Sequence, residues 1–208
     1  MDFTISYAVT ACDEHEELKE LLSFLCEHKR EQDEVVVQCD LDNTTAAVKS
    51  VLKAFSDEIE TLSYFALNKD FGAFKNNLKS LCRGDYIFQI DADELPALET
   101  VRNLYLIISA NPGVDLFLVP RINTVEGITK EHVRKWDWHL SEDKWVNWPD
   151  YQPRILKNSF NIKWKNKVHE TITGHSTAVQ LPAEGRFSLR HHKAIAKQER
   201  QNAFYKGI

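Results

Sequence analysis

The sequence predicts an α/β fold: a mostly parallel central sheet with helices on both faces, followed by a smaller antiparallel C-terminal part. Over residues 1–120, short apolar segments alternate with amphipathic helical patterns. Such alternation is typical of parallel sheets, because each parallel pair of strands needs a crossover that is usually a helix. The alternation breaks down over residues 121–208, and the length of 208 residues favours one domain over two.

The first strand is predicted over residues 3–9, and the first helix begins near Asp13. Asp13 is a suitable N-cap, and the leucines after it recur at helical spacing. A run of valines at residues 35–37 predicts a short buried second strand. Either Thr44 or Thr45 is expected to cap the second helix, whose apolar residues again fall on one face.

Three further strands are predicted over residues 62–67, 86–90 and 114–119. The helix before residues 86–90 is expected to end at Gly84, since glycine commonly follows the last helical turn. Pro96 is expected in the first turn of the next helix, where its missing N–H breaks no helical hydrogen bond. These elements complete the alternation of strand and helix.

After Pro120 the pattern becomes irregular. Short antiparallel strands are expected over residues 152–156 and 187–191, and a helix over residues 194–205. Flat aromatic rings in this region suit stacking on a sugar ring, and they equally suit a second small core under a long loop. The rings in question are all five tryptophans of the chain, Trp136, Trp138, Trp145, Trp148 and Trp164.

Composition disfavours several classes of protein. The formal net charge is −5 and the pI about 5.9, so no overall basic field attracts nucleic acid, and a nucleic-acid partner is not expected. The four cysteines lack CxxC spacing, which indicates reduced thiols and a reducing compartment. No apolar run approaches the roughly 18 residues that span a bilayer. We therefore expect a cytoplasmic protein without a transmembrane segment.

The most informative segment is residues 84–94, in which an apolar strand leads directly into two acids, Asp91 and Asp93. Alternate residues of an extended strand point to the same side, so both carboxylates can face one divalent cation at the end of the strand. An Asp-x-Asp motif also occurs in ordinary turns and helix starts. Its position after a buried strand favours the metal site.

Polar residues also follow the earlier predicted strands. Thr10 and Glu14 follow the first strand, Asp40 the second and Lys69 the third. In an open parallel sheet, ligands bind beyond the carboxyl ends of the strands, so these side chains are expected to share one cleft. No glycine-rich phosphate loop follows the first strand, which disfavours P-loop and dinucleotide-binding proteins. A metal ion would then neutralise the charge of a bound phosphate.

Four segments together resemble a family 2 glycosyltransferase with the GT-A fold. Their order, spacing and strand context agree with that family, and they are residues 10–14, 35–40, 71–76 and 84–94. The resemblance implies a single GT-A domain over residues 1–208. In this domain, residues 1–120 would form the half that binds a nucleotide sugar, and residues 121–208 the half that binds the acceptor.

The same resemblance implies roles for individual residues. Asp40 would accept a hydrogen bond from the nucleotide base, and Asp93, assisted by Asp91, would hold Mn²⁺ or Mg²⁺ on the diphosphate. Carboxylate oxygens suit both tasks. The remaining contacts to the nucleotide sugar would come from Thr10, Ala11, Glu14, Lys69, Asn76 and Asp91. Cys12 and Cys39 depart from the family pattern, so nucleotide contacts there are expected to differ.

The second half resembles a subset of this family through residues 151–156, 164–170 and 189–192. In that subset a segment equivalent to Val168-His169-Glu170 lies on the acceptor side. We expect Glu170 to be the catalytic base, with Asp150 and Glu94 as alternatives. His169 is either catalytic or a buried core histidine.

A histidine near the end of the chain would complete the metal shell, as it does in many GT-A enzymes. We expect His191 to be this ligand, because it lies at the end of a predicted strand. His192 would point to the opposite face, since adjacent residues of a strand alternate.

The function expected from these patterns is a metal-dependent, inverting glycosyltransferase of the hexosyltransferase kind. It would move a sugar from a nucleotide-diphosphate donor, such as a UDP sugar, to an acceptor hydroxyl on a glycan, a protein or a modified base. A non-catalytic glycan- or nucleotide-binding module with the same fold is an alternative. A sugar-phosphate nucleotidyltransferase is a second alternative, which the missing glycine-rich loop disfavours.

Overall fold

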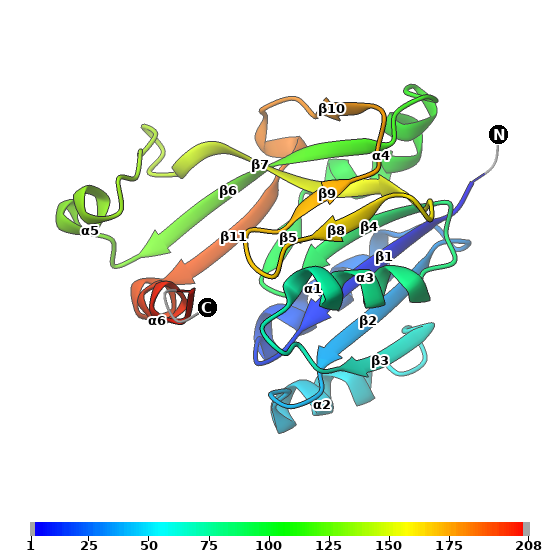
Figure 1. The fold of residues 1–208 in the computed structure, drawn as a ribbon, viewed down its shortest axis with the longest axis horizontal. Coiled ribbons are helices and arrows are strands. Elements are labelled where there is room, and N and C mark those ends of the chain that lie inside the picture. Colours follow the sequence, from blue (N-terminus) through cyan, green and yellow to red (C-terminus); the bar gives the residue numbers. More distant parts are fainter. Residues whose placement is uncertain (1–2, 206–208) are drawn as a thin grey trace.

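The structure is a computed structural model that describes residues 3–205, and it is a sheet with helices packed against its two faces (Figure 1). The elements in chain order are β1 (Ile5–Ala11), α1 (His15–His28), β2 (Glu34–Asp40), α2 (Ala46–Ala54), β3 (Thr61–Phe65), α3 (Phe71–Leu81), β4 (Tyr86–Asp91), β5 (Glu94–Pro96), α4 (Leu98–Ser109), β6 (Leu116–Glu126), α5 (Lys130–Lys135), β7 (Val146–Lys157), β8 (Lys163–Lys165), β9 (Thr171–Thr173), β10 (Ala178–Gln180), the 3₁₀ turn η1 (Gly185–Phe187), β11 (Leu189–Ala194) and α6 (Ile195–Tyr205).

The main sheet has the strand order β3-β2-β1-β4-β7-β6-β11-β5, and β10 pairs with β6 at its side. Strands β3, β2, β1 and β4 are parallel, whereas β7 is antiparallel to both β4 and β6. The short hairpin β8–β9 forms a separate sheet. The α/β fold class with a mostly parallel sheet is therefore confirmed.

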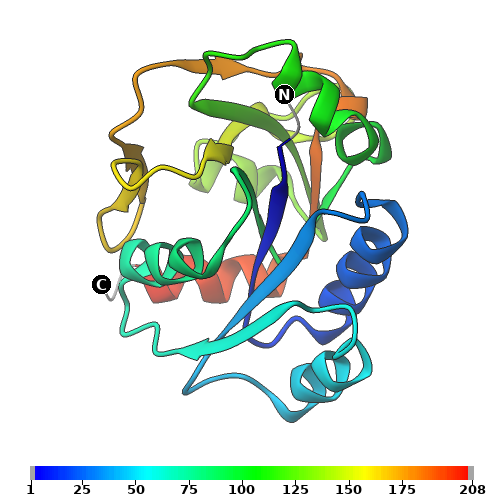
Figure 2. The same ribbon diagram turned by 90° about the vertical axis from the view of Figure 1, so that its right-hand side faces the viewer.

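Two apolar cores lie on opposite faces of the sheet. Figure 2 shows helices on both sides of the strands. Successive residues of β2 alternate between them: Val35 and Val37 pack in the core that includes α1, α2 and α4, whereas Val36 packs in the core of α3 and the β8–β9 hairpin. Every residue of β2 is buried. This two-sided burial explains why the strand is a run of valines rather than an alternating pattern.

Some predicted helix ends are wrong. Helix α1 starts at His15 with Glu14 at the N-cap position, and Asp13 does not cap it. Thr45 caps α2 as expected, since its hydroxyl accepts a hydrogen bond from Val48 N at 3.3 Å. Pro96 ends strand β5, and α4 begins only at Leu98 because residues 94–96 are held in the sheet by β11.

Gly84 has a packing role in place of the predicted helix stop. Helix α3 already ends at Leu81, and a Cβ added at Gly84 would lie 2.6 Å from Ser6 N. The glycine thus allows the chain to pass close to the backbone of β1. The strand predicted over residues 187–191 starts at Leu189 and is mixed: it is parallel to β6 and antiparallel to β5.

Glu34 ties β1 to the end of α3. Its Oε1 accepts hydrogen bonds from Ser6 Oγ and Arg83 N, both at 2.6 Å, and its Oε2 faces the Arg83 guanidinium at 2.9 Å. Burial would raise the pKa of Glu34, but these hydrogen bonds outweigh it and lower the pKa. Glu34 is therefore a charged group that the fold stabilises.

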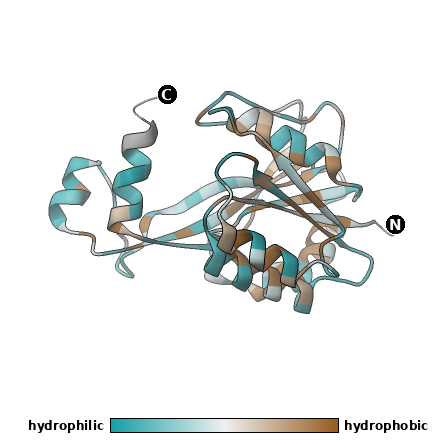
Figure 3. Ribbon diagram, turned by 90° about the horizontal axis from the view of Figure 1, so that it is seen from below, coloured by the Kyte–Doolittle hydropathy of each residue, from teal (hydrophilic) through white to brown (hydrophobic). Residues whose placement is uncertain are grey.

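Apolar residues gather in the strands and inner helix faces, whereas α5 and the described part of α6 are largely hydrophilic (Figure 3). The four cysteines are free thiols, as predicted from their spacing. Within residues 3–205, no helix has the length and apolar character needed to cross a bilayer.

Candidate active site

A cavity of about 580 Å³ opens beyond the carboxyl ends of β1, β2 and β4. Residues from both the N-terminal and the C-terminal half of the sequence line it. Among them are most of the residues predicted from the sequence: Thr10, Ala11, Glu14, Asp40, Asp91, Asp93, Asp150, Glu170 and His191. Of the polar residues expected to share one cleft, Thr10, Glu14 and Asp40 line this cavity, whereas Lys69 does not.

Asp91 is held by two neighbours at the end of β4. Thr10 Oγ1 donates a hydrogen bond to its Oδ1 at 2.8 Å, and Arg154 Nη2 donates to its Oδ2 at 2.6 Å. Burial would raise the pKa of Asp91, but the charges of Arg154 and Lys75 and the bond from Thr10 lower it below its ordinary value. Asp91 is therefore an ionised carboxylate with a fixed orientation.

Asp93 lies two residues further on and faces several basic groups. Its Oδ2 is 3.4 Å from His191 Nε2, 3.4 Å from Lys197 Nζ and 3.8 Å from Lys193 Nζ. Burial would raise the pKa of Asp93, but the hydrogen bond and charge of His191 and the charges of the two lysines outweigh it and lower the pKa. Asp93 is thus a buried anion at the centre of a basic environment.

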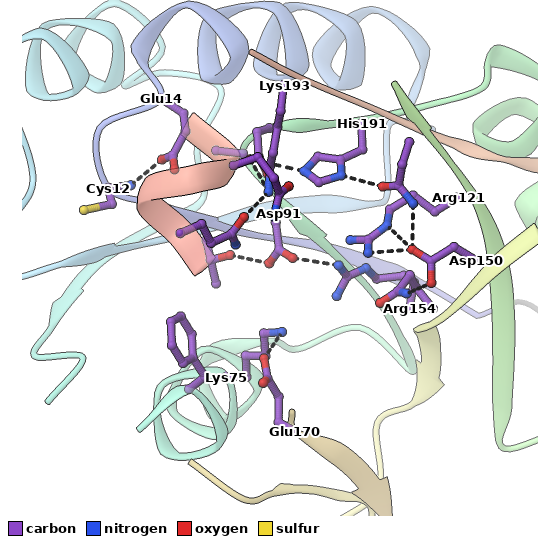
Figure 4. A pocket seen from close by; sticks show the side chains of 18 of the residues that line it. Cys12, Glu14, Lys75, Asp91, Arg121, Asp150, Arg154, Glu170, His191 and Lys193 are labelled. Atoms are coloured by element: carbon purple, nitrogen blue, oxygen red, sulfur yellow. Dashed lines mark hydrogen bonds and ion pairs between the residues drawn. The ribbon is translucent and has the colours of Figure 1, made fainter. Parts of the chain in front are cut away.

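His191 is oriented by a second contact on the other side of its ring. Its Nδ1 lies 2.7 Å from Asn123 Oδ1. Because Oδ1 is an acceptor, Nδ1 carries the proton, and Nε2 is the nitrogen that faces Asp93 (Figure 4). A metal-binding histidine is commonly oriented in this way.

The donor set of Asp93 and His191 fits a Mn²⁺ or Mg²⁺ ion that is completed by phosphate oxygens and water. A protein-only shell is not formed: within residues 3–205, no group of three His, Cys, Asp or Glu side chains could hold a metal ion. The carboxylate oxygens of Asp91 are already engaged by Thr10 and Arg154. Asp91 as a direct metal ligand therefore stays a prediction.

Glu14 and Asp40 line the cavity beyond the carboxyl ends of β1 and β2. Glu14 Oε2 accepts hydrogen bonds from Cys12 N at 3.0 Å and Asp13 N at 3.1 Å, and burial and the charge of Asp93 raise the pKa of Glu14. Asp40 accepts from Leu67 N at 3.2 Å, so it fixes the loop after β3 as well as facing the cavity.

An ionic network borders the cavity: its members Arg121, Asp150 and Arg154 line the cavity and are labelled in Figure 4, and Glu94 lies behind them. Glu94 Oε1 accepts hydrogen bonds from Arg154 Nη2 at 2.7 Å and from Arg121 Nη1 at 2.9 Å, and the Glu94 side chain is fully buried. The Asp150 carboxylate accepts bonds from Arg121, Asn123 and Gln152. Burial would raise the pKa of Asp150, but the charge of Arg121 and these bonds lower it.

These contacts separate the three candidate bases. Glu94 is not among the residues that line the cavity, and two arginines cover it. Asp150 lines the cavity but has a lowered pKa, which makes it a weak proton acceptor. Glu170 lines the cavity on its opposite wall. The structure therefore favours Glu170 among the three.

Glu170 is held by Lys75, whose Nζ is 2.5 Å from Glu170 Oε1 and 4.7 Å from the centre of the Trp164 ring. The β8–β9 hairpin that leads to Glu170 is docked on α3. Phe71 N donates to Lys167 O at 2.9 Å, and a Cβ at Gly72 would lie 2.5 Å from Asn166 O. Gly72 thus permits the close approach of hairpin and helix.

Two residues predicted to contact the nucleotide sugar, Asn76 and Lys69, do not line the cavity. The Asn76 side chain bonds the backbone N and O of Trp164 at 2.9 and 2.8 Å, so it holds the hairpin and lies outside the cavity. Lys69 is exposed in a turn with φ 56° and also lies outside the cavity. Both side chains lie outside the cavity, because neighbouring positions in a loop or helix point in different directions.

Burial distinguishes the environments of the three candidate histidines, His169, His191 and His192. His169 is exposed and lines the cavity, so it is not a core histidine. His191 is buried, whereas His192 is exposed on the other face of β11, where Thr124 Oγ1 lies 2.9 Å from its Nδ1. The predicted alternation of His191 and His192 is confirmed.

The tryptophans lie in different environments, and stacking of any of them on a sugar stays a prediction. Trp164 is a core residue, 4% exposed, and packs with Ile162 and Ile172. Trp138 is half-buried, lines the cavity and lies 4.7 Å from Trp136 between ring centres. A second pair, Trp145 and Trp148, has a ring separation of 4.9 Å.

Sequence patterns missed the basic residues of the site, which are Lys75, Arg121, Arg154, Lys193 and Lys197. Lys75 had a visible signal, since it lies four residues after Phe71 and three before Leu78 on the apolar side of a helix. Arg154 had a similar signal, because it interrupts an apolar strand. Lys193 had no such signal in the sequence, because only the pairing of β11 with β6 turns its side chain towards the cavity.

The sheet, its helices and the acidic strand ends define the GT-A class of fold. Residues 6–178 match the model of the family described as glycosyl transferase family 2. The chain belongs to glycosyl transferase family 2. No curated protein matches the sequence.

Solved structures similar to this chain include residues 1–349 of TarS from S. aureus. The complex with UDP has a TM-score of 0.65 at 14% identity and covers 91% of this chain and 60% of TarS 1–349. The complex with UDP-GlcNAc has a TM-score of 0.64, also at 14% identity, covering 93% of this chain and 59% of that one. This chain thus spans about 60% of the TarS fragment.

A mannosyltransferase from Pyrobaculum calidifontis, PcManGT, solved in complex with GDP-Man and Mn²⁺, has a TM-score of 0.50 at 19% identity. The match covers 58% of this chain and 36% of that one. At these identities the likeness establishes the fold.

Proposed function

We propose that the chain is a metal-dependent, inverting glycosyltransferase that uses a nucleotide-diphosphate sugar as donor. One observation carries this proposal: Asp93 and His191 converge on one side of a cavity whose opposite wall carries an acid, Glu170. Residues of both 1–120 and 121–208 line this cavity, which supports treating residues 1–208 as one domain.

The nucleoside would bind at Thr10, Ala11, Glu14 and Asp40, which line the cavity. That TarS structures of similar fold are described as complexes with UDP and UDP-GlcNAc supports a nucleotide-sugar donor. Asp93 and His191 would hold Mn²⁺ or Mg²⁺. When bound, the ion supplies Lewis-acid stabilisation of the negative charge that builds up on the departing diphosphate. Asp91, fixed by Thr10 and Arg154, would orient the donor beside them.

Glu170 would act as the catalytic base. It would remove the proton of the acceptor hydroxyl while the acceptor oxygen forms a bond to the anomeric carbon of the donor sugar. The bond from that carbon to the diphosphate oxygen breaks, and its electron pair leaves with the diphosphate. Lys75 contacts Glu170 at 2.5 Å and is its positioning residue.

The acceptor would enter past Trp138, the half-buried ring that lines the cavity. A flat aromatic face of this kind stacks on the apolar side of a sugar ring, which supports a glycan acceptor. The membership of the Val-His-Glu subset stays a prediction, and with it the exact part that His169 plays.

The test is release of nucleoside diphosphate from UDP and GDP sugars with Mn²⁺ present. We expect slow donor hydrolysis by the wild-type protein, loss of it in Asp93→Ala and retention in Asp143→Ala, an exposed acid outside the cavity. Full metal-dependent hydrolysis by Asp93→Ala would contradict the metal assignment.

The non-catalytic alternative has one supporting observation: the ion pair with Lys75 engages the carboxylate proposed as base. Titration calorimetry distinguishes the two functions. A binding module would take up UDP or GDP sugars in the presence of Mn²⁺ and hydrolyse none of them, whereas an enzyme would do both.

A further inference from the structure

Two lysines of the C-terminal segment, Lys193 and Lys197, face Asp93, and neither belongs to a sequence motif. Lys193 lies on β11 two residues after His191, so both side chains reach the cavity from the same face of that strand (Figure 4). Lys193 is 7% exposed and lines the cavity. Lys197 lies on α6 and is closer to the solvent.

The Lys193 ammonium is incompletely paired for a buried charge. Gln201 Oε1 accepts a hydrogen bond from its Nζ at 2.7 Å, and Asp93 Oδ2 lies 3.8 Å away, beyond hydrogen-bond distance. Since a buried ammonium is stable only with adequate partners, an anionic ligand in the cavity would complete its environment.

The local charges indicate what kind of anion fits. Asp93 and Glu14 are the acids next to Lys193 and Lys197, with Lys197 Nζ 3.4 Å from Asp93 Oδ2 and 3.9 Å from Glu14 Oε1. Two acids and two lysines balance. A divalent cation at Asp93 and His191 would leave an excess of positive charge, which the diphosphate of a nucleotide sugar neutralises.

We propose that Lys193 is a catalytic residue that contacts the diphosphate leaving group, with Gln201 as the residue that positions its ammonium. This inference rests on the proposed function. As the bond between the anomeric carbon and the phosphate oxygen breaks, the electron pair passes to that oxygen. Lys193 donates a charge-assisted hydrogen bond to the diphosphate and keeps its proton.

The inference is tested with four nucleotides, UDP, UMP, GDP and GMP, titrated in the presence of Mn²⁺. In Lys193→Met, we expect affinity for the diphosphate that the wild type binds to fall about 10- to 100-fold, as for loss of a charged hydrogen bond. Affinity for the matching monophosphate should change less than about twofold, because that ligand lacks the second phosphate. Lys193→Arg should recover most of the lost affinity.

Two controls separate this role from a structural one. Lys53→Met removes an exposed lysine of α2 and should leave all four affinities unchanged. Mn²⁺ binding, followed by electron paramagnetic resonance without nucleotide, should not weaken in Lys193→Met. Melting curves show which variants are folded. If Lys193→Met is not folded, the nucleotide affinities of Lys193→Arg are compared with those of the wild type.

Equal loss of diphosphate and monophosphate affinity in Lys193→Met, or no loss of either, overturns the inference. It is also overturned if Mn²⁺ binding falls by the same factor as diphosphate binding, since Lys193 would then act only through the metal site. Failure of the wild type to bind either diphosphate is a different result, because it contradicts the proposed function itself.

Discussion

Gly72→Ala is expected to impair catalysis much more than folding. The new Cβ would lie 2.5 Å from Asn166 O, and ordinary van der Waals contact begins at 3.4 Å, so helix α3 and the β8–β9 hairpin must separate by about 0.9 Å. The obstacle is a backbone carbonyl, which cannot rotate away as a flexible side chain can. Glu170 lies in the loop of this hairpin, directly before β9, so a shift of the hairpin would move it from its position beside Lys75.

The expected changes in melting temperature and turnover rate follow from two opposing effects on stability and one effect on the rate. Overpacking costs about 1–3 kcal/mol, while alanine in place of a helical glycine stabilises by about 0.5–1 kcal/mol. The melting temperature should therefore fall by only a few degrees, at about 2–4 °C per kcal/mol for a protein of this size. A displacement near 1 Å at the base can lower the turnover rate about 100-fold.

The assay measures nucleoside diphosphate release, Mn²⁺-dependent UDP or GDP binding and melting temperature on the same preparations. Nucleotide binding should be retained, because Asp93 and His191 lie away from the hairpin. Gly113→Ala is the matched control, since a Cβ there meets nothing within 4 Å. Wild-type turnover in Gly72→Ala would show that the docking of the hairpin does not position the base.

Three further predictions concern stability and reactivity. Arg154→Met should destabilise the fold by about 3–5 kcal/mol, measured by urea unfolding, because it removes the ion-pair partner of Asp91 and leaves the buried Glu94 with Arg121 alone; a loss below about 1 kcal/mol would contradict this. The pKa of Glu34 is lower in the folded protein than in the unfolded chain, where it is about 4.3. The contribution of Glu34 to stability should therefore be complete above the unfolded-state pKa and be lost as the pH falls through the folded-state pKa. The free energy of unfolding in urea should therefore differ between Glu34→Gln and the wild type at pH 7, and this difference should shrink at low pH. An equal difference at both pH values would refute the lowered pKa of Glu34. Burial raises the pKa of Cys82 to about 12, so its alkylation by iodoacetamide at pH 8 should be slow in the native protein and fast in urea, whereas equal rates would show that it is accessible.

The alternation of strand and helix was predictable because it depends on local patterns. The valines of residues 35–37 and the apolar residues 86–90 are each buried on both sides, so hydrophobic runs identify them. The acids at the strand ends were predictable for a related reason: parallel strands all end at the same edge, which brings Asp40 and Asp91 to one cavity.

Contacts between segments far apart in the chain were not predictable in the same way. Asn76 and Lys75 are neighbours on α3, yet Asn76 bonds Trp164 and Lys75 reaches Glu170, because the hairpin docks on one particular side of the helix. Pro96 resembles a helix start but belongs to a strand, because β11 pairs with the segment that contains it. Neither outcome is encoded within a few residues of the position concerned.

The sequence by itself determined the α/β class, the acids at the strand ends and the family, since hydrophobic period and strand-end chemistry are local properties of the chain. The tertiary structure decided which base faces the cavity, which acids are covered by arginines, and that Lys193 stands beside Asp93. The physical reason is that buried charges require partners, and those partners come from elements more than fifty residues away, such as Arg154 for Asp91 and Lys75 for Glu170.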